Sequence, residues 1–389
     1  TVNGYRSYGM MTTTGQSAGF LNQDPAVGNG TSYLSLAPNG TINVNGDEST
    51  GFAILVGIND WGGSGTINVG TVNPNQDSNG NLHSSLNLVE RATGLYSKQP
   101  LIGVSCSSIT GTCGSGGING TGIINIGTFA YQSSGARVEE SGNIGNAGII
   151  SVTGDYNYGA VITGGIFSNH IWTPGGDTGR IYINANNAVG IYVNGGSATG
   201  ENKSVLNVNG NSSIGFLMNN GQGYNLGLNN NPLDYWRGDG TIETTGINSH
   251  SVVLTRENTA LNTIFQNSGV IRNNSEGTVG IYAEKGSQFH HRIEITTGYT
   301  AKVQSGNGAI GIYARDTGTY GTITAPVVTG NSTASNTSIA VMSDGSPIIE
   351  FYNNGSASME QANLNIGQNA VGLYSINGSK FSDTFKIHG

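Results

Sequence analysis

Charged side chains are scarce in this chain. Asp, Glu, Lys and Arg make up 10% of its 389 residues, whereas an average soluble domain has about a quarter. The formal net charge is −8 and the pI is about 5.2, which gives no basic surface for a phosphate backbone. The composition argues against an ordinary helical or α/β enzyme surface. We expect neither nucleic acid nor an anionic membrane surface as a partner.

Long apolar runs are missing as well. The longest run, residues 52–58, has seven residues, far fewer than the roughly 18 that a membrane-spanning helix needs. We therefore expect no membrane insertion by this segment. The start at Thr1, without an initiator Met, is expected of a processed chain or a fragment.

Cysteine is limited to two residues, Cys106 and Cys113, in the polar segment SCSSITGTC. Two thiols with no His nearby cannot complete a zinc site. We predict a disulfide that closes this small loop, and such a bond favours an oxidising, exported setting. Two reduced, solvent-facing cysteines are the alternative.

Glycine and asparagine are abundant instead, with 64 and 48 residues. Both disfavour helix interiors, and both tolerate the positive φ of tight corners. A motif of a small residue or Gly followed by an apolar pair, as in AVGIY (188–192), recurs along the chain. Its centres are 19, 51, 94, 136, 159, 190, 215, 252, 280, 311, 340 and 372. A spacing of about 30 residues is typical of a solenoid, and it predicts twelve units.

A second motif alternates strictly between apolar and polar residues, as in GTINV (40–44) and GIINI (122–126). Such alternation is typical of a strand with one buried face. Its central residues predict one inward ladder of Ile42, Ile67, Ile124, Ile150, Ile181, Leu206, Ile242, Ile271, Ile323 and Leu364. The first motif predicts a second inward ladder of Phe20, Phe52, Leu95, Ile191, Phe216, Ile281, Ile312, Val341 and Leu373.

Strands that recur in register, with no room for a helix between them, pair most economically with their counterparts in the next unit. We predict an all-β fold: a single right-handed parallel β-helix (β-solenoid) of about twelve coils over residues 1–389. Longer loop insertions are expected near 54–90, 97–121, 165–178 and 218–240. An outward ladder that shares amide hydrogen bonds is expected at Asn43, Asn68, Asn125, Asn207 and Asn365.

The alternating GTINVNG and VGIY units, with few Lys and Cys and many Gly and Asn, resemble the passenger of a type V autotransporter. The likeness is to the large repeat-built outer-membrane adhesins typical of fusobacteria and related anaerobes, and it covers essentially the whole chain. It implies a passenger segment that is displayed on a bacterial cell surface or secreted. The repeat residues are structural, so the resemblance does not name a ligand.

Catalytic motifs were sought because enzymes also use this scaffold. The four motifs of polygalacturonase-like hydrolases are absent, and the nearest sequence is Arg292-Ile293-Glu294. The pairs of adjacent acids lie in polar connectors, and a calcium-binding nonapeptide does not occur. His290 and His291 are neighbours, so they would point to opposite faces of a strand. We expect no enzyme activity, no catalytic residue, no metal and no cofactor.

Aromatic residues supply the candidate binding sites. Trp61, Trp172 and Trp236 fall in segments interpreted as longer loops, where they would present stacking faces or fold back onto the rod. Arg237 and Asp239 flank Gly238 in an RGD tripeptide, which is either an integrin ligand or a turn.

A row of tyrosines is the other candidate. Alternation in AVGIYV places Val189, Ile191 and Val193 inward, so Tyr192 points outward. The same position in other units holds Tyr96, Tyr282, Tyr313, Met342 and Tyr374. Such a stripe marks a contact surface, packs under a loop, or is a tyrosine ladder that only stiffens the rod.

We therefore predict an extracellular adhesin-type passenger that binds a host cell-surface protein or glycan. The first alternative is a stalk or filament that associates through its open solenoid ends. The second is a pectate-lyase-like carbohydrate-active enzyme.

Overall fold

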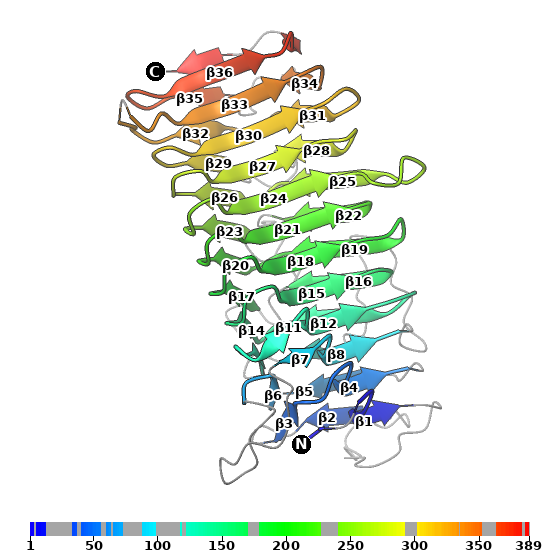
Figure 1. The fold of residues 1–389 in the computed structure, drawn as a ribbon. Helices are drawn as coiled ribbons and strands as arrows, with labels where there is room; N and C mark the ends of the chain where they lie inside the picture. The colour runs from blue at the N-terminus through cyan, green and yellow to red at the C-terminus, as the bar shows by residue number, and fades with distance from the viewer. Residues whose placement is uncertain are drawn as a thin grey trace, which may run out of the picture.

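Three long parallel β-sheets run side by side along the chain, as the computed structural model shows (Figure 1). No helix occurs among the residues that the structure describes. These are residues 1–3, 5–12, 33–36, 40–55, 60–63, 65–72, 88–98, 117–118, 122–169, 179–226, 240–291, 302–333, 335–351, 363–382 and 386–388. The prediction of an all-β parallel solenoid is confirmed.

Each coil contributes one strand to each sheet, and each sheet has twelve strands. The first sheet contains β1 (Tyr8–Thr12), β4 (Thr50–Ile54), β8 (Thr93–Ser97), β12 (Ser134–Val138), β15 (Tyr158–Ile162), β18 (Val189–Val193), β21 (Ile214–Asn219), β24 (His250–Thr255), β27 (Val279–Ala283), β30 (Ile310–Arg315), β33 (Ile339–Asp344) and β36 (Val371–Ile376).

The second sheet contains β2 (Tyr33–Leu36), β5 (Asp60–Gly63), β9 (Gly117–Ile118), β13 (Asn143–Asn146), β16 (Gly165–Asn169), β19 (Ala198–Asn202), β22 (Gly221–Asn225), β25 (Thr263–Asn267), β28 (Gln288–His291), β31 (Tyr320–Ile323), β34 (Ile348–Phe351) and β37 (Lys380–Ser382).

The third sheet contains β3 (Thr41–Val44), β6 (Thr66–Val69), β10 (Ile123–Ile126), β14 (Ile149–Val152), β17 (Arg180–Ile183), β20 (Val205–Val208), β23 (Thr241–Thr244), β26 (Val270–Asn273), β29 (Lys302–Ser305), β32 (Val327–Thr329), β35 (Asn363–Asn365) and β38 (Lys386–His388). A separate short pair joins β7 (Val89–Glu90) to β11 (Ala130–Tyr131).

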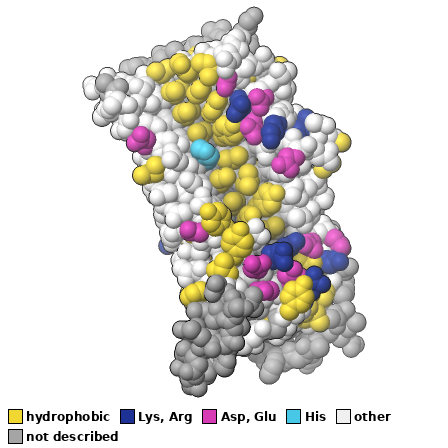
Figure 2. All heavy atoms as spheres, viewed as in Figure 1, with side chains coloured by type: hydrophobic (Ala, Val, Ile, Leu, Met, Phe, Trp, Pro, Cys, Tyr) yellow, Lys and Arg dark blue, Asp and Glu magenta, His cyan; other side chains and the backbone are white. Residues whose placement is uncertain are grey.

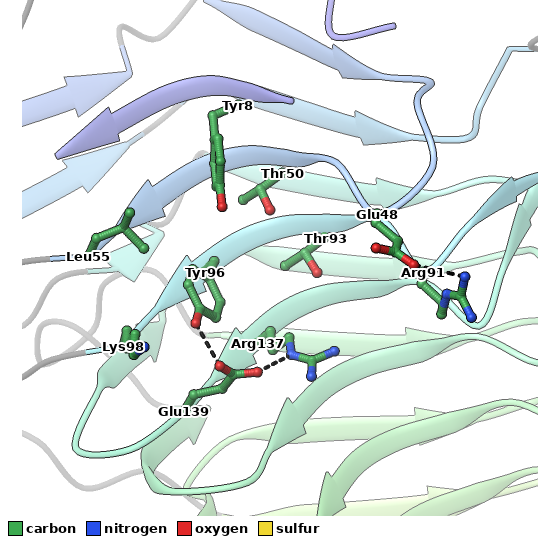
Figure 3. Close-up of a pocket in the computed structure, with 10 residues that line it drawn as sticks. All are labelled: Tyr8, Glu48, Thr50, Leu55, Arg91, Thr93, Tyr96, Lys98, Arg137 and Glu139. Atoms are coloured by element: carbon green, nitrogen blue, oxygen red, sulfur yellow. Dashed lines mark hydrogen bonds and ion pairs between the residues drawn. The ribbon is translucent and has the colours of Figure 1, made fainter. Parts of the chain in front are cut away.

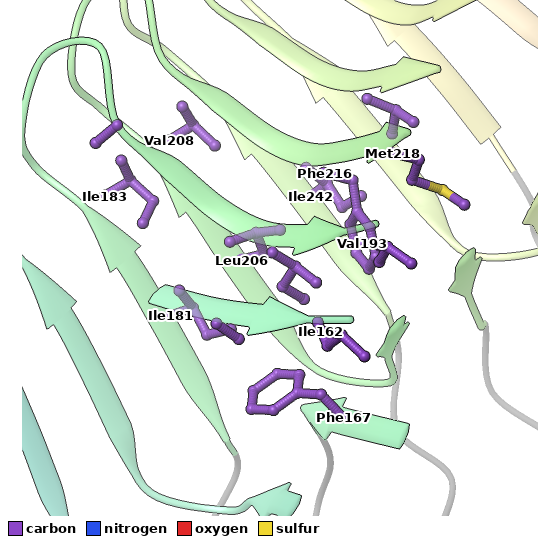
Figure 4. Close-up of a cluster of buried hydrophobic side chains, with 14 of the residues drawn as sticks. Ile162, Phe167, Ile181, Ile183, Val193, Leu206, Val208, Phe216, Met218 and Ile242 are labelled. Carbon is purple, nitrogen blue, oxygen red and sulfur yellow. The ribbon is translucent and has the colours of Figure 1, made fainter. Parts of the chain in front are cut away.

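Apolar side chains from all three sheets fill the interior, where equivalent residues of successive coils lie next to one another (Figure 4). The inward ladder of the third sheet follows the predicted order from Ile42 to Ile271, and these residues are nearly inaccessible to solvent. It then continues through Val303 and Val327 to Leu364. The prediction that Ile323 belongs to this ladder is wrong.

Ile323 ends β31 of the second sheet, where its neighbour in the next coil is Phe351. The sequence GTIT alternates like a strand of the third sheet, but alternation reports one buried face and does not say which sheet that face belongs to.

The start of the first sheet also differs from the prediction. The strand that pairs with β4 is β1, with Met10 opposite Phe52, rather than the segment SAGFL around Phe20. Phe20 lies outside the described residues. The remaining members of the second predicted ladder, from Phe52 to Leu373, do occupy equivalent inward positions.

Glycine sets the shape of the first sheet. In AVGIY, a Cβ at Gly190 would lie 2.7 Å from Leu206 of the core and 2.6 Å from the carbonyl oxygen of Gly215 in the next coil. Gly190 and Ile191 therefore both face inward, and the strand pairing skips the glycine. As a result Val189 lies outward beside Tyr192, which corrects the prediction that it points inward.

The second sheet packs large rings against glycines. Phe289 lies opposite Gly321 of the next coil, and a Cβ on Gly321 would be only 2.0 Å from that ring. Inward positions that hold Gly break the apolar alternation of these strands. Strands also occur within the ranges expected as loop insertions near 54–90, 97–121, 165–178 and 218–240, among them β5, β9, β16 and β22.

Two asparagine ladders run along the rod. The outward ladder was predicted, and Asn68 Nδ2 donates to Asn43 Oδ1 at 2.8 Å while Asn125 Nδ2 donates to Asn68 Oδ1 at 3.0 Å. Ser151 follows Asn125 in register, so this ladder stops there. The prediction that Asn207 and Asn365 extend it is wrong, because Asn207 lies between Tyr182 and Glu243 and Asn365 lies opposite Val328. The second ladder was not predicted. It is buried and runs along the carboxyl ends of the strands of the second sheet. Amide hydrogen bonds of 2.8–2.9 Å link Asn146, Asn169, Asn202, Asn225 and Asn267.

His291 occupies the next place in the buried ladder. Its Nδ1 lies 3.0 Å from Asn267 Nδ2 and its Nε2 lies 3.1 Å from the carbonyl oxygen of Pro326. Burial lowers the pKa of His291 to about 4. His290 points the other way, toward the hydroxyl of Thr322, as expected for neighbours in a strand.

Candidate binding surface on the first sheet

The outer face of the first sheet carries two parallel columns of side chains. One column comes from the residue before the inward glycine and the other from the residue two places after it. From β15 to β36 the first column is Tyr158, Val189, Ile214, His250, Val279, Ile310, Ile339 and Val371, and the second is Val161, Tyr192, Leu217, Val253, Tyr282, Tyr313, Met342 and Tyr374. We call these sixteen residues the apolar stripe. Figure 2 shows it as a nearly continuous band along the rod.

The predicted tyrosine row lies within this stripe. Tyr282, Tyr313, Met342 and Tyr374 are neighbours in register. The rings of Tyr282 and Tyr313 meet edge to face, with centroids 5.2 Å apart. Tyr374 is 44% exposed, whereas Tyr282 and Tyr313 are half-buried. The structure thus brings Tyr282, Tyr313 and Tyr374 together.

Hydroxyl groups in the row have partners within the molecule. The Tyr282 hydroxyl donates to Glu284 Oε2 at 2.7 Å and accepts from Arg315 Nη1 at 3.3 Å. The Tyr313 hydroxyl donates to Asp344 Oδ2 at 3.0 Å. Burial raises the pKa of Tyr282 to about 12 and, with Asp344, also raises the pKa of Tyr313. Both phenols are neutral at physiological pH, and the parts of the rings that neighbouring stripe residues leave uncovered are available for contact.

His250 is the one ionisable residue of the stripe besides the tyrosines. Its ring stacks on that of Tyr282, with an interplanar angle of 14° and centroids 6.1 Å apart. Burial lowers the pKa of His250 below its usual value. The stripe is therefore uncharged at neutral pH over its whole length.

The N-terminal coils present a different surface on the same sheet. A cavity of about 650 Å³ opens there, and we call it the charged pocket (Figure 3). It is lined by Tyr8, Glu48, Thr50, Leu55, Arg91, Thr93, Tyr96, Lys98, Arg137 and Glu139. The residues that replace apolar stripe positions include Thr50 and Thr93 in the first column and Arg137 in the second. Sequence reasoning missed this pocket.

One side of the charged pocket is a column of three charged residues, Arg6, Glu48 and Arg91, at the turns that enter the first sheet; we call it the ion ladder. Glu48 lies between two arginines of adjacent coils, with Arg6 Nε 2.5 Å from Oε2 and Arg91 Nη2 2.8 Å from Oε1. All three residues have positive φ, between 50° and 52°, because each stands at the tight turn that enters the first sheet. The hydrogen bond from Arg6 lowers the pKa of Glu48.

The other side is centred on Glu139. Its carboxylate accepts a hydrogen bond from the Tyr96 hydroxyl at 2.6 Å and one from Arg137 Nε at 2.7 Å (Figure 3). Burial alone would raise the pKa of Glu139, but these two hydrogen bonds outweigh it and the pKa lies below its ordinary value. Burial and the bond to Glu139 raise the pKa of Tyr96. Lys98 pairs with Glu140 at 3.0 Å.

A signal for the ion ladder is present in the sequence. Arg6, Glu48 and Arg91 each stand three residues before the inward glycine of their coil, which is Gly9, Gly51 or Gly94. Alignment of the units on that glycine would have placed the three charges in one column. The prediction of Phe20 as the start of the first coil concealed the first of them.

The other predicted site residues cannot be placed. Trp172, Trp236, Arg237 and Asp239 lie outside the described residues, as do Cys106 and Cys113. Trp61 belongs to β5, whose backbone pairs with β2, so the prediction that it falls in a loop is wrong. Their roles as ligands or as a disulfide stay predictions.

Within the described part of the chain, no three His, Cys, Asp or Glu side chains lie close enough to hold a metal ion. A search of the same residues found no helix with the length and apolarity to cross a bilayer. No family model, curated protein or solved structure matches the chain.

Proposed function

We propose that the chain is an adhesin-type passenger, displayed on a cell surface or secreted, that binds a host cell-surface protein or glycan through the outer face of its first sheet. The observation that carries the proposal is the apolar stripe. It extends over eight coils, or about 35 Å at the usual spacing between paired strands. Most of its side chains are partly exposed, whereas Val189 and Val279 are buried between their neighbours. A solvent-facing apolar band of that extent usually marks a contact surface.

The stripe is a rigid surface, which favours binding. Strand pairing fixes the backbone beneath each column, as it does for Tyr282 and Tyr313, so little backbone freedom is lost when a partner binds. Aromatic rings with two rotatable bonds supply large contact areas at low entropic cost. Polar groups flank the band, including Glu284 and Asp344.

Binding accounts for the charged pocket better than acid–base catalysis does. A general acid needs a proton at working pH, and so its pKa lies near that pH. The pKa values of Glu48 and Glu139 are instead lowered by arginines and a tyrosine. Both carboxylates are ionised at neutral pH and hold neighbouring side chains in place. Neither carboxylate is therefore suited to act as the general acid of a carboxylate pair, and we propose that the chain is not an enzyme.

An attachment assay tests the proposal. The double variant Tyr282→Ser, Tyr313→Ser should reduce binding of the purified chain to host cells at least fivefold. The matched control is Tyr182→Ser, Tyr320→Ser, which removes two half-buried tyrosines from the outer faces of the third and second sheets. The control should bind within twofold of the unchanged chain. Equal attachment by all three proteins would contradict a binding role for the stripe.

A second candidate function is a structural stalk or filament that self-associates through solenoid ends. It is favoured by the internal bonds of the tyrosine hydroxyls, because a ladder tied to Glu284, Arg315 and Asp344 also stiffens the rod. A stalk would bind no host cells or glycans. It would show concentration-dependent association by analytical ultracentrifugation that the double variant leaves unchanged.

A further inference from the structure

The charged pocket is the part of the first sheet whose chemistry the apolar stripe does not explain. We propose that it binds a saccharide that carries a carboxylate. The proposal rests on the proposed function, because it names one ligand class for a binding surface, but it concerns a separate site on the rod. Apolar rings, hydroxyl groups and unevenly matched charges meet in this one cavity of about 650 Å³.

Guanidinium groups provide the contact for the carboxylate. Arg137 binds Glu139 through Nε, and Arg91 binds Glu48 through Nη2. In each case the other guanidinium nitrogens make no hydrogen bond or ion pair with a described residue. The side chains of Arg91 and Arg137 are 56% and 41% exposed. Arginine holds carboxylates in a two-pronged geometry, and the carboxylates already present fix the orientation of both guanidiniums.

Charge within the pocket favours an anion. Its lining has three cations, Arg91, Lys98 and Arg137, and two carboxylates, Glu48 and Glu139. Lys98 also pairs with Glu140 and Glu48 with Arg6, so the whole cluster has four cations and three carboxylates, an excess of one positive charge. The chain as a whole has a net charge of −8. A polyanion would be repelled by the rest of the surface, whereas a ligand with a single carboxylate matches the local excess.

Tyrosine rings and hydroxyl groups point to a saccharide. Tyr8, which is 47% exposed, lies above Thr50 in the pocket, and Tyr96 lies in the next coil but one (Figure 3). The C–H faces of sugars stack on such rings. Thr50 and Thr93 form the floor, where their hydroxyls suit the hydroxyls of a sugar. Glu139, fixed by its two donors, has lone pairs left to accept from a further hydroxyl.

Titration calorimetry with two sugars tests the proposal on the full chain. The probes are 3′-sialyllactose, which carries one carboxylate, and its methyl ester, which is the same trisaccharide with that carboxylate neutralised. We expect 3′-sialyllactose to bind at least tenfold more tightly than the ester. Arg137→Gln should weaken its binding at least tenfold. The control Arg272→Gln, on the outer face of the third sheet, should change it less than twofold.

Three results would overturn the proposal. The first is equal binding, or no binding, of the two sugars. The second is unchanged binding of 3′-sialyllactose by Arg137→Gln. The third is displacement of 3′-sialyllactose by a hexaglutamate peptide at equal concentration, which would identify a site for acidic peptides. Circular dichroism of each variant, together with Tyr8→Ala as a second pocket variant, separates loss of binding from loss of fold.

Failure of this proposal can be told from failure of the proposed function. The pair Tyr282→Ser, Tyr313→Ser leaves the charged pocket intact, so it should retain 3′-sialyllactose binding while cell attachment falls. Attachment that depends on the stripe, with no sugar binding in the pocket, would reject only the saccharide site.

Discussion

The charged pocket and the apolar stripe occupy the same face of the same sheet, yet their chemistry is opposite. The first column holds Thr50 and Thr93 in the N-terminal coils but Ile310 and Ile339 in the C-terminal coils. Beneath both regions the inward positions are mostly apolar, although they range in size from Ala136 to Phe52, and glycine recurs at the same place in most coils. The comparison teaches that the inward residues specify the coil and leave the outward columns free to acquire different binding chemistry.

The largest loss of stability is expected from substitutions in the hydrophobic core that lies beneath both regions. Ile281, beneath the stripe, and Ala136, beneath the pocket, are both fully buried in one continuous core. Asp at either position would place an unpaired charge there. We expect Ile281→Asp and Ala136→Asp each to lower the free energy of unfolding by about 4 kcal/mol or more, as judged from chemical denaturation.

The control for these core variants is Asn68→Asp. Asn68 is on the outward ladder and half-exposed, so its replacement should cost about 1 kcal/mol. Equal losses for Ile281→Asp and Asn68→Asp would refute the assignment of inward and outward positions. A large loss at Ile281 with none at Ala136 would show that the two regions unfold independently.

The second largest effect is expected on acidification, which should lower the stability of the fold through His291 before it affects the charged pocket. The pKa of His291 is about 4 in the fold and about 6.5 when unfolded, so between these values the unfolded chain binds more protons. Stability therefore falls as the pH falls from about 6.5 to 4, by about 3 kcal/mol in total. His291→Asn removes the titrating group and lets the buried amide ladder continue. Its melting temperature should depend much less on pH in that window.

His290→Asn is the matched control for the acid effect. His290 is partly exposed beside Thr322, and its variant should keep the pH dependence of the unchanged chain. If His291→Asn still loses stability steeply between pH 6.5 and 4, another group causes the loss.

Much of this fold is encoded in periodic signals. The third sheet was predicted because residues such as Ile42 and Asn43 alternate in nearly every unit, and the twelve coils follow from the recurring glycine motif. The second sheet was not predicted, because Gly200, Gly223 and Gly321 occupy inward places where an apolar residue was sought. What recurs in the second sheet is an Asn at the last position of successive strands, where it continues the buried amide ladder. A search for apolar alternation does not detect this polar repeat.

The candidate site was predictable only where it repeats. Tyr282, Tyr313 and Tyr374 hold one position in the motif, so register alone placed them together. The charged pocket arises from contacts such as Tyr96 with Glu139, 43 residues apart. Those residues hold different positions in their coils, so no period reports their proximity. The positions of exposed side chains relative to one another decide which partner they bind, and the repeat pattern of the sequence does not specify those positions.

A smaller effect on stability is expected in the stripe itself. The variant Tyr282→Ser, Tyr313→Ser loses one edge-to-face contact and part of two half-buried rings. We expect a loss of about 2 kcal/mol and a melting temperature lowered by a few degrees. If stability instead falls as far as in Ile281→Asp while attachment is unchanged, the stripe serves packing and the binding site moves to the segments around Trp172 and Trp236.

The smallest effect is expected for the pocket, where Glu139→Gln removes one partly exposed carboxylate. The pKa of Glu139 is lowered in the fold, so its stabilisation is present above the unfolded pKa of about 4.5 and is lost as the pH falls through the folded value. Because the carboxylate is 27% exposed and its partner Arg137 41% exposed, solvent screening keeps this contribution below about 1 kcal/mol. Chemical denaturation at pH 7 should show Glu139→Gln slightly less stable than the unchanged chain, and the difference should shrink as the pH falls below about 4.5. Most of the His291 window lies above that pH, so acid titration distinguishes the two regions. A deficit that does not shrink on acidification would mean that Glu139 acts through packing rather than charge.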